Sequence, residues 1–331
     1  MPFFSIILPV YNAKKYVAET VKSILNQSFQ DFELIVINDG ATDGSDVIVK
    51  NFVSENENIK FFSKTNGGIC QSRNYGIERA KGKYIMFCDH DDIMIEGALE
   101  RAFTFLMKNS VDVLKFSYQT FVIHDGIESK SYINYCEDRD SVNYSDSLKR
   151  NYTQFNNFIN TVWNGVYRKD YIIANELKFD ETIKFGQEDV IFNLQVLRNN
   201  CTYGMINDIY YYHYIRYGQS TSRVFDLNKL QAIVESMKLE KVFFKNDIKD
   251  EIAVDMADKY IRSFFVSLGI SKNSLNKIEN DNLMKIFNNE LPNVSLLKCM
   301  FLVINKPKAV FKILLFRLHL FKILKYLLKG Q

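Results

Sequence analysis

The chain has 331 residues, of which 47% are hydrophobic and 24% are charged, and its formal net charge is +3. This balance excludes a wholly disordered chain and fits one large domain or two smaller ones. The charge is unevenly distributed, because residues 291–331 contain seven Lys and one Arg but neither Asp nor Glu. By subtraction, +3 minus +8, the rest of the chain carries a net charge of about −5.

Five cysteines are spread widely along the chain, and no two of them form a C-x-x-C motif. An odd number at wide spacing favours reduced structural thiols over a disulfide framework or a zinc site. The N-terminus begins with an apolar, strand-like run rather than the pattern of a signal peptide. No run of about 18 apolar residues is available for a membrane-spanning helix. These features predict a cytoplasmic protein.

The first hundred residues alternate between strand-like and helix-like patterns. Short apolar runs predict strands at 3–10, 32–37, 59–62 and 84–88, and apolar residues at helical spacing predict helices at 16–27, 46–53, 69–80 and 95–108. Such alternation is typical of a parallel sheet with helices on both faces. Right-handed crossovers then bring the loops that follow the strands to one edge of the sheet.

Residues 110–225 lose this strict alternation. Here the sequence predicts strands at 111–121, 162–167 and 210–214, a polar stretch with a possible hairpin at 125–145, and helices after 168 and at 188–197. From Leu227 onward the pattern is helical. We therefore expect a domain boundary near Phe225.

Three acidic residues, Asp89, Asp91 and Asp92, directly follow the strand predicted at 84–88. Carboxylates this close together repel one another, and each is costly to bury without a partner. One interpretation is a solvated acidic turn that caps the next helix. The other is a site for a hard divalent cation, because ligands of open α/β sheets bind at the carboxyl ends of the strands.

Two further charged residues, Asp39 and Arg73, are expected near the same edge of the sheet. Carboxylates, a divalent cation and an arginine together suit a nucleoside diphosphate, whose phosphates the metal bridges. The sequence contains neither G-x-G-x-x-G nor G-x-x-x-x-G-K-[ST]. A dinucleotide-binding fold and a P-loop are therefore not supported.

Seven short segments, in this order and at this spacing, resemble the motifs of the family-2 inverting glycosyltransferases of GT-A fold, bacterial cell-surface polysaccharide type. They are Val10-Tyr11-Asn12, Asn38-Asp39-Gly40, Asn66-Gly67-Gly68 with Arg73-Asn74, Asp89-His90-Asp91-Asp92, Trp163 to Arg168, Gln187-Glu188-Asp189, and Tyr212 to Ser220. The resemblance covers residues 3–222. Asn38, Ala41 and Cys70 depart from the residues common in the family, which leaves the donor sugar open.

The resemblance implies an α/β fold of GT-A type, with a Rossmann-like, mostly parallel sheet flanked by helices and a C-terminal helical extension. Residues 1–110 would form the nucleotide-sugar-binding half of the GT-A domain and residues 111–225 its acceptor-binding half. Residues 226–331 would form a helical region with a basic amphipathic tail.

The resemblance also implies a role for each motif residue. Asp39 would hold the uracil of a UDP-sugar, with the loop from Pro9 to Tyr11 beside it. Arg73 would lie near the base or the diphosphate, and Asp89 would contact the ribose or the donor sugar. Asp91 would ligate Mn²⁺ or Mg²⁺. Asp189 would be the general base. The remaining expected contacts are Arg216 with the diphosphate, and Trp163 and Glu188 with the acceptor.

Each of these residues also has a purely structural interpretation. Asp39 is a common residue in an Asx-turn, and Arg73 suits an ordinary surface ion pair. Glu188 and Asp189 suit the N-terminus of a helix, where the dipole favours acidic side chains. Trp163 is expected to belong partly to the core, and His213, within an aromatic strand, is expected to pack rather than to ligate a metal.

The predicted function is transfer of a hexose or N-acetylhexosamine, with inversion, from a UDP-sugar to a hydroxyl of a glycan or lipid-linked oligosaccharide. One alternative is a sugar nucleotidyltransferase, which should carry a Gly-rich loop after its first strand, where this chain has Pro9 to Asn12. The other is a non-catalytic nucleotide- or glycan-binding protein of the same fold. The acidic residues Asp89, Asp91 and Asp189 argue against it.

The C-terminal segment 307–328 has helical spacing. Its apolar face would contain Ile313, Phe316, Leu320, Leu324 and Leu327, and its basic face Lys308, Lys312, His319, Lys322 and Lys329. A basic amphipathic helix favours an anionic membrane surface, so we expect peripheral association with the inner face of the cell membrane. The alternative is a helix packed on the catalytic domain. No nucleic-acid motif accompanies the charge, and no nucleic-acid partner is expected.

Overall fold

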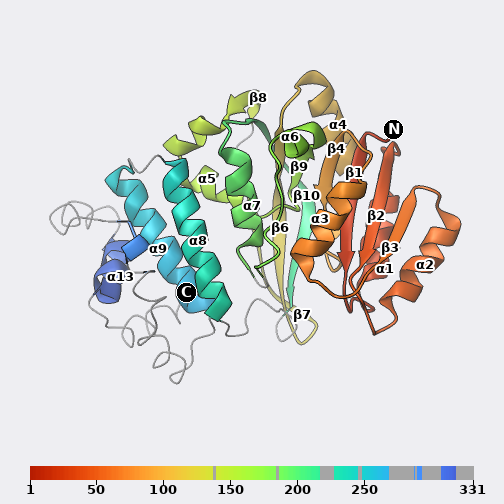
Figure 1. Ribbon diagram of the computed structural model, residues 1–331, viewed down its shortest axis with the longest axis horizontal. Helices are drawn as coiled ribbons and strands as arrows, with labels where there is room; N and C mark the ends of the chain where they lie inside the picture. Colours follow the sequence, from red (N-terminus) through yellow and green to blue (C-terminus); the bar gives the residue numbers. More distant parts are fainter. Residues whose placement is uncertain are drawn as a thin grey trace. The chain divides into compact units, whose positions relative to one another are not determined.

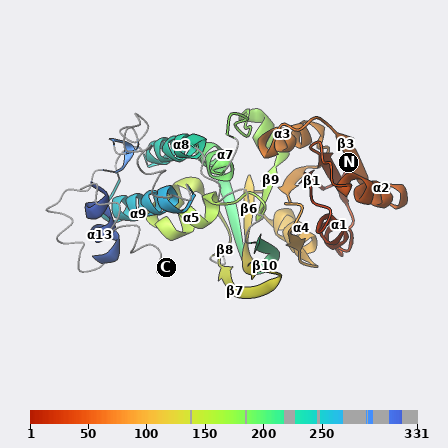
Figure 2. The same ribbon diagram turned by 90° about the horizontal axis from the view of Figure 1, so that it is seen from below.

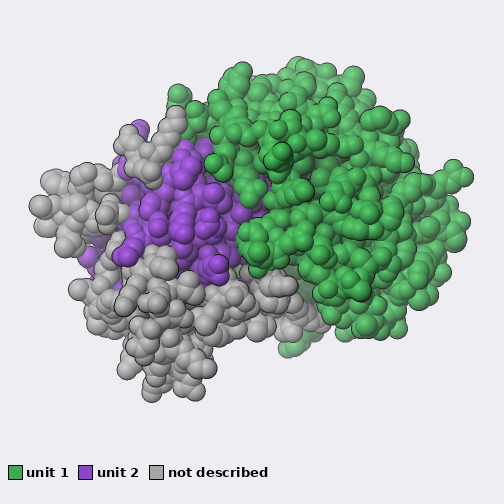
Figure 3. Space-filling model, in the orientation of Figure 1, with its two compact units in different colours: residues 1–184, 195–220 green, residues 185–194, 221–331 purple. Residues whose placement is uncertain are grey.

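The structure is a computed structural model, which describes residues 1–136, 139–183, 186–216, 227–244, 248–267, 287, 289–292 and 307–317. The chain divides into two compact units, coloured separately in Figure 3. Unit 1 comprises residues 1–184 and 195–220, and unit 2 comprises residues 185–194 and 221–331. The division of the chain into a donor half, an acceptor half and a helical region stays a prediction.

Unit 1 is built on a mixed sheet with the strand order β3-β2-β1-β4-β9-β6-β10-β5, in which β7 pairs with β6 and β8 with β10. The strands are β1 (Phe4–Val10), β2 (Phe32–Asn38), β3 (Ile59–Ser63), β4 (Tyr84–Phe87), β5 (Ile93–Met94), β6 (Val113–His124), β7 (Ile127–Asn134), β8 (Arg139–Tyr144), β9 (Gly165–Arg168) and β10 (Thr202–Arg216). The α/β class with flanking helices is as predicted (Figure 1).

The parallel arrangement is concentrated in the first hundred residues. Strands β3, β2, β1 and β4 run parallel, as their alternation with helices predicts. Farther along, β6 and β10 also pair in parallel, whereas β9 lies antiparallel to both β4 and β6. The carboxyl ends of β1, β2, β3 and β4 therefore share one edge of the sheet.

Helices cover both faces of this parallel block. They are α1 (Val17–Leu25), α2 (Ser45–Glu55), α3 (Ile69–Arg79) and α4 (Ala98–Lys108). Figure 2 shows α3 on one face of the sheet and α1 with α4 on the other. The alternation of side chains along β1 explains this, because every second residue from Phe4 to Val10 enters one core cluster with α1 and α4.

The opposite face of β1 receives α3 at close range. A Cβ atom added to Gly76 of α3 would lie 2.5 Å from Cγ2 of Ile7. Only glycine leaves room for this approach, so Gly76 sets how near α3 lies to the sheet. The position of α3 in turn determines where its buried residue Arg73 lies.

Several elements differ from the sequence-based prediction. The helix expected from Ile95 begins at Ala98, because Ile93 and Met94 form β5 and pair with β10. Strand β10 has 15 residues rather than the five of the predicted aromatic core. The helix α5 (Tyr152–Ile159) was not predicted at all. Periodicity within one segment does not report a partner strand that lies more than a hundred residues away.

The rest of unit 1 comprises a 3₁₀ helix at Ser145–Arg150, the helix α6 (Lys169–Ala174) and the C-terminal end of α7 (Glu188–Leu197). The range of α7 is the predicted one. The hairpin that the structure contains is β6 with β7, joined at Asp125 and Gly126, so its first strand lies before the range 125–145 in which a hairpin was expected. The other strand of that range, β8, pairs with β10 instead of β7.

Unit 2 contains the start of α7 and the helices α8 (Leu227–Phe243), α9 (Asp250–Ser267) and α13 (Pro307–Arg317). Its core includes an aromatic cluster in which Phe264 of α9 contacts Phe287 and Phe316 at ring distances of 5.1 and 5.6 Å. Helix α13 is thereby packed on α9 through its apolar face, to which Val310 and Ile313 also contribute buried side chains.

The position of Lys312 corrects the expected basic face of the C-terminal helix. Lys312 is buried, and its Nζ lies 3.2 Å from Oδ1 of Asp258 on α9. An acidic residue from another helix thus offsets this charge, which the sequence of the tail alone did not indicate. Lys308 is exposed, as predicted. The remaining tail residues in this prediction, from His319 to Lys329, lie outside the described residues.

Within the described ranges, we find no helix with the length and hydropathy needed to cross a lipid bilayer.

Candidate functional site

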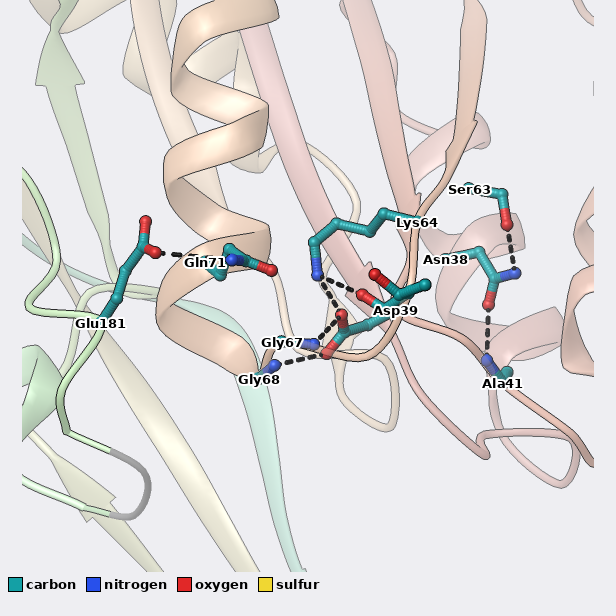
Figure 4. Close-up of polar contacts among 10 residues, drawn as sticks. Asn38, Asp39, Ala41, Ser63, Lys64, Gly67, Gly68, Gln71 and Glu181 are labelled. Atoms are coloured by element: carbon teal, nitrogen blue, oxygen red, sulfur yellow. Dashed lines mark hydrogen bonds and ion pairs between the residues drawn. The ribbon is translucent and has the colours of Figure 1, made fainter.

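Asp39 follows β2 at the carboxyl edge of the sheet, and its side chain is buried. Oδ1 accepts the backbone N–H of Gly67 at 2.9 Å, and Oδ2 accepts that of Gly68 at 2.8 Å (Figure 4). Lys64 at the end of β3 forms an ion pair with the same carboxylate. Asp39 therefore ties the glycine loop before α3 to the end of β2. Its predicted contact with uracil stays a prediction.

The loop around Asp39 is further fixed by its neighbour Asn38. The Asn38 amide donates to Ser63 Oγ at 3.0 Å and accepts the backbone N–H of Ala41 at 3.0 Å. Gly40 has a φ of +72°, and a Cβ atom there would lie 2.9 Å from the backbone N of Asn66. The close approach of these two loops thus depends on glycine at position 40.

Arg73 and Asp89 form the second charged pair of the edge. Arg73, on α3, is almost fully buried, and its guanidinium donates to Asp89 Oδ1 at 3.1 Å. The guanidinium carbon lies 5.9 Å from the ring centre of Phe87 and 5.1 Å from that of Phe179. Arg73 is therefore not the exposed surface ion pair of the structural interpretation. A buried arginine positioned by two aromatic rings holds the first carboxylate of the acidic turn.

Asp91 pairs with Arg216 at the end of β10. Arg216 donates to Asp91 Oδ2 at 2.8 Å, although 125 residues separate the two in sequence. The Arg216 guanidinium also lies 4.0 Å from the ring centre of Tyr16, just before α1, and 4.8 Å from that of Tyr214. Sequence analysis proposed both Asp91 and Arg216 but gave no signal for their pairing.

Asp92 is buried, unlike Asp89 and Asp91, whose side chains are about one-third exposed. Its Oδ1 accepts the backbone N–H of Tyr214 at 2.9 Å. Burial, together with the charges of Asp91 and Asp89, raises the pKa of the Asp92 carboxyl well above its usual range. The carboxyl group thus joins the acidic turn to β10.

Further contacts connect the acidic turn with β1 and β10. His90 Nδ1 lies 3.2 Å from the carbonyl oxygen of Pro9, within hydrogen-bond distance. The backbone N–H of Asp89 donates to the hydroxyl of Tyr211 at 3.0 Å. Next to Pro9, the side chain of Tyr11 is 47% exposed, which leaves its ring accessible.

Trp163 packs inside unit 1. Its ring is 4% exposed and stacks on Tyr211 at 4.6 Å and on His213 at 5.0 Å. The packing of His213 follows the structural interpretation. Trp163 is a core residue that packs against Tyr211. Its contact with an acceptor stays a prediction.

Glu188 and Asp189 begin α7 and belong to unit 2. Both side chains are half-buried, and they occupy the first turn of the helix. Within unit 1 the structure brings together the donor candidates Asp39, Arg73, Asp89, Asp91 and Arg216 through their neighbouring loops. Glu188 and Asp189, the candidates for acceptor binding and catalysis, belong to unit 2.

Lys64 and Tyr16 were missed by sequence analysis. Lys64 lies two residues before the Asn66-Gly67-Gly68 motif, and Tyr16 is the first residue of the helix predicted at 16–27. A single lysine or tyrosine in a polar segment carries no pattern of its own. Only the fold brings Lys64 to Asp39 and Tyr16 to Arg216.

A family model described as "Glycosyl transferase family 2" matches residues 5–174, about half of the chain. The chain belongs to glycosyl transferase family 2. The matched range includes the loops of Asp39, Arg73 and Asp91. The resemblance seen in the sequence motifs is therefore confirmed.

The chain is also similar in sequence to two bacterial proteins, GgaB and GlyG. The chain is 30% identical over 232 residues to the minor teichoic acid biosynthesis protein GgaB of Bacillus subtilis (strain 168), covering 68% of this chain and 24% of GgaB. It is 28% identical over 270 residues to glycosyltransferase GlyG of Streptococcus pneumoniae serotype 4, covering 80% of this chain and 85% of GlyG. The chain thus spans about a quarter of the length of GgaB.

Among solved structures, residues 1–349 of TarS from S. aureus in complex with UDP align with a TM-score of 0.68 and 21% sequence identity. The alignment covers 100% of this chain and 92% of that one. At this identity the likeness establishes the fold, and the predicted GT-A architecture of this family-2 member is confirmed.

Proposed function

We propose that this family-2 chain is an inverting glycosyltransferase of cell-surface polysaccharide synthesis. It would transfer a hexose or N-acetylhexosamine from a UDP-sugar to a hydroxyl of a glycan or lipid-linked oligosaccharide. The observation that carries the proposal is the pair of carboxylate–arginine contacts, Asp89 with Arg73 and Asp91 with Arg216, beside the acidic turn. The similarity to GgaB, a minor teichoic acid biosynthesis protein, supports the polysaccharide setting, and the UDP in the TarS complex supports a UDP donor.

A diphosphate suits this charge arrangement. Guanidinium groups bind phosphate oxygens through charge-assisted hydrogen bonds, so Arg216 and Arg73 could exchange a carboxylate for a phosphate when the donor binds. Pro9, Tyr11 and Asp39 would surround the uracil. Asp89 would then face the ribose or the sugar. Each of these roles follows the family motifs. The exposure of Tyr11 and the partial exposure of Asp89 support it for these two residues, whereas Asp39 and Arg73 are buried in the structure.

The acidic turn has the chemistry to bind a divalent metal. Each of Asp89 and Asp91 uses one carboxylate oxygen for its arginine, and both side chains are partly exposed. Oxygen donors of this kind suit Mn²⁺ or Mg²⁺ when diphosphate oxygens and water complete the coordination. Among the described residues, no group of three or more His, Cys, Asp or Glu forms a protein-only site. We assign Asp91 as the metal ligand; the metal would offset charge on the leaving diphosphate.

Inversion requires a base on the acceptor side. An acceptor hydroxyl must attack the anomeric carbon opposite the leaving diphosphate, and a carboxylate within reach must take its proton. We assign this role to Asp189, with Glu188 and Trp163 as acceptor contacts. A partly exposed carboxylate at the start of α7 can accept a proton from a bound hydroxyl.

The alternative functions lack matching features. A nucleotidyltransferase would need a glycine-rich, basic loop after β1, where this chain has Pro9 to Asn12. A non-catalytic binding protein would keep donor binding without turnover. Measuring the release of nucleoside diphosphate from the donor separates it from an enzyme.

The purified protein is incubated with a panel of nucleotide sugars, Mn²⁺ and a glycan acceptor, and released nucleoside diphosphate is measured. We expect UDP release with one UDP-sugar, and we expect Asp189→Asn to abolish transfer while UDP binding is kept. Near-normal turnover of Asp189→Asn would move the base elsewhere, with Glu188→Gln as the next variant. UDP binding without release from any donor would favour the non-catalytic alternative.

A further inference from the structure

The turn that precedes Glu188 and Asp189 has an unusual backbone. Gly186 and Gln187 both have a φ of +69°, in the left-handed region that residues other than glycine rarely adopt. The carbonyl oxygen of Gln187 accepts the backbone N–H of Ile191 at 2.9 Å and so starts the hydrogen bonding of α7. A strained residue persists only where its surroundings hold it in place.

The side chain of Gln187 is held by helix α8. Ser236 is fully buried, and its hydroxyl donates to Gln187 Oε1 at 3.1 Å. The same hydroxyl lies within reach of the Ile233 carbonyl, at 2.9 Å, so that the helix backbone fixes its position. Both residues belong to unit 2.

Ser236 adjoins a buried charged network between α8 and α9. Glu240, one helical turn after Ser236, is fully buried, and its Oε2 accepts from Lys259 Nζ and from the Tyr260 hydroxyl, each at 2.6 Å. Burial raises the pKa of Tyr260 well above its usual range, as does the Glu240 charge, while a hydrogen bond with Ser236 opposes the increase. The network of Glu240, Lys259 and Tyr260 therefore lies one turn of α8 away from Ser236.

We propose that Ser236 and Gln187 are positioning residues for transfer: their hydrogen bond holds the strained turn that orients the carboxylates of Glu188 and Asp189. The helical region after residue 226 thus acts on catalysis through α7. Because Gln187 precedes Glu188 directly, a change in its backbone angles would redirect both acidic side chains. The inference rests on the proposed function, since it assigns the base to Asp189.

The test is a double-mutant cycle with Ser236→Ala and Gln187→Ala, measured by steady-state transfer. Each single variant is expected to lower kcat about tenfold, the effect of one lost hydrogen bond, with an unchanged KM for the UDP-sugar. The double variant is expected to lose about the same tenfold, because both changes remove the same contact. Ser236→Thr, which keeps the hydroxyl, should restore most of kcat.

Lys241→Ala is the matched control. It lies on the same helix and breaks the 2.8 Å ion pair with Glu290, but it has no link to Gln187 among the described contacts. We expect it to leave kcat close to wild type. Wild-type kcat in Ser236→Ala, losses that multiply in the double variant, or a Ser236→Thr variant as slow as Ser236→Ala would overturn the proposal.

Hydrogen exchange of the Ile191 amide provides a readout that needs no turnover. Its exchange should be faster in Ser236→Ala and Gln187→Ala than in Lys241→Ala, because its acceptor is the Gln187 carbonyl. A wild-type protein that transfers no sugar would overturn the proposed function. Unchanged Ile191 exchange in both variants would overturn the positioning role whether or not transfer occurs.

Discussion

At the scale of single residues, the acidic turn contains three carboxylates with three different environments. Asp89 faces a buried arginine, Asp91 faces a partly exposed arginine from the end of β10, and Asp92 is buried against the backbone of Tyr214. Because like charges repel at this distance, the two arginines and the raised pKa of Asp92 reduce the net repulsion. Such an arrangement keeps two charged carboxylates available for a bound ligand.

Replacing Asp91 by alanine should remove the metal-dependent part of UDP binding. We expect UDP affinity in Mn²⁺ to fall about tenfold or more, equivalent to about 1.4 kcal/mol, and the Mn²⁺ dependence itself to disappear. Titration calorimetry with and without Mn²⁺ measures both. Asp46→Ala, which breaks an exposed ion pair with Lys50 on α2, is the control. Equal Mn²⁺ dependence in the wild type and Asp91→Ala would reject Asp91 as the ligand.

Replacing Asp92 by asparagine should change how stability depends on pH. Its pKa is higher in the folded than in the unfolded state, so its stabilisation is complete below the unfolded pKa of about 3.9 and is lost as pH rises through the folded pKa. An asparagine side chain at this position cannot ionise, but its amide oxygen can still accept the N–H of Tyr214.

The free energy of unfolding, measured by urea titration between acidic and mildly alkaline pH, should therefore fall less steeply with rising pH in Asp92→Asn than in the wild type. Parallel pH profiles for the two proteins would show that the Asp92 carboxyl titrates alike in the folded and unfolded states.

At the scale of secondary structure, β10 connects most of the candidate donor site. Its residues supply the Tyr211 hydroxyl to Asp89, the Tyr214 backbone to Asp92 and the Arg216 guanidinium to Asp91. The strand pairs in parallel with β6 along most of its length, and it pairs in the antiparallel direction with β5, which follows the acidic turn. A single long strand thus contacts Asp89, Asp91 and Asp92, three residues of a loop that is far away in sequence.

The packing of α13 on α9 can be tested directly. Lys312→Met removes the charge opposite Asp258 but keeps an apolar stem of similar length. Because Arg262 also pairs with Asp258 at 2.8 Å, we expect a moderate loss of about 1–3 kcal/mol in the free energy of unfolding.

The exposed Lys308 on the same helix is the matched control. Lys308→Met should change the free energy of unfolding by less than about 0.5 kcal/mol. Chemical denaturation of both variants measures the difference. Equal effects at the two positions would mean that the buried ion pair does not hold α13 in place.

At the scale of the whole molecule, the net charge of +3 combines an acidic body with a basic C-terminal segment. We propose peripheral membrane association through this segment, because anionic lipid attracts clustered lysines by about 1 kcal/mol per residue near the surface. The buried Lys312 does not contribute, since its charge faces Asp258. Lys322, Lys325 and Lys329 follow α13 in the sequence and lie outside the described residues. We propose that these three lysines supply the attraction.

The triple variant Lys322→Glu, Lys325→Glu and Lys329→Glu should lose binding to anionic vesicles, because it reverses this charge. Co-sedimentation with phosphatidylserine-containing vesicles measures the loss, and neutral phosphatidylcholine vesicles serve as the control. If the wild-type protein binds neither kind of vesicle, the tail has no membrane role. Equal binding of the triple variant would assign the interaction to another surface.

The sequence by itself determined the alternation of strands and helices in the first hundred residues, the range of α7 and the location of the acidic turn after a buried strand. These features are local, because a strand or helix with one buried face has apolar residues at intervals of two or 3.6 residues within its own segment. The motif residues that reveal family 2 are also short and contiguous. Local pattern was therefore sufficient for the fold class, and it named the candidate residues, whose roles stay predictions.

Only the tertiary structure decided which of these residues meet. The pairs Lys64 with Asp39 and Arg216 with Asp91 join positions 25 and 125 residues apart, and the antiparallel pairing of β9 and the docking of Lys312 on Asp258 depend on packing between distant elements. The sequence around a charged side chain does not indicate its ion-pair partner. Strand register and helix packing determine which distant residue it meets.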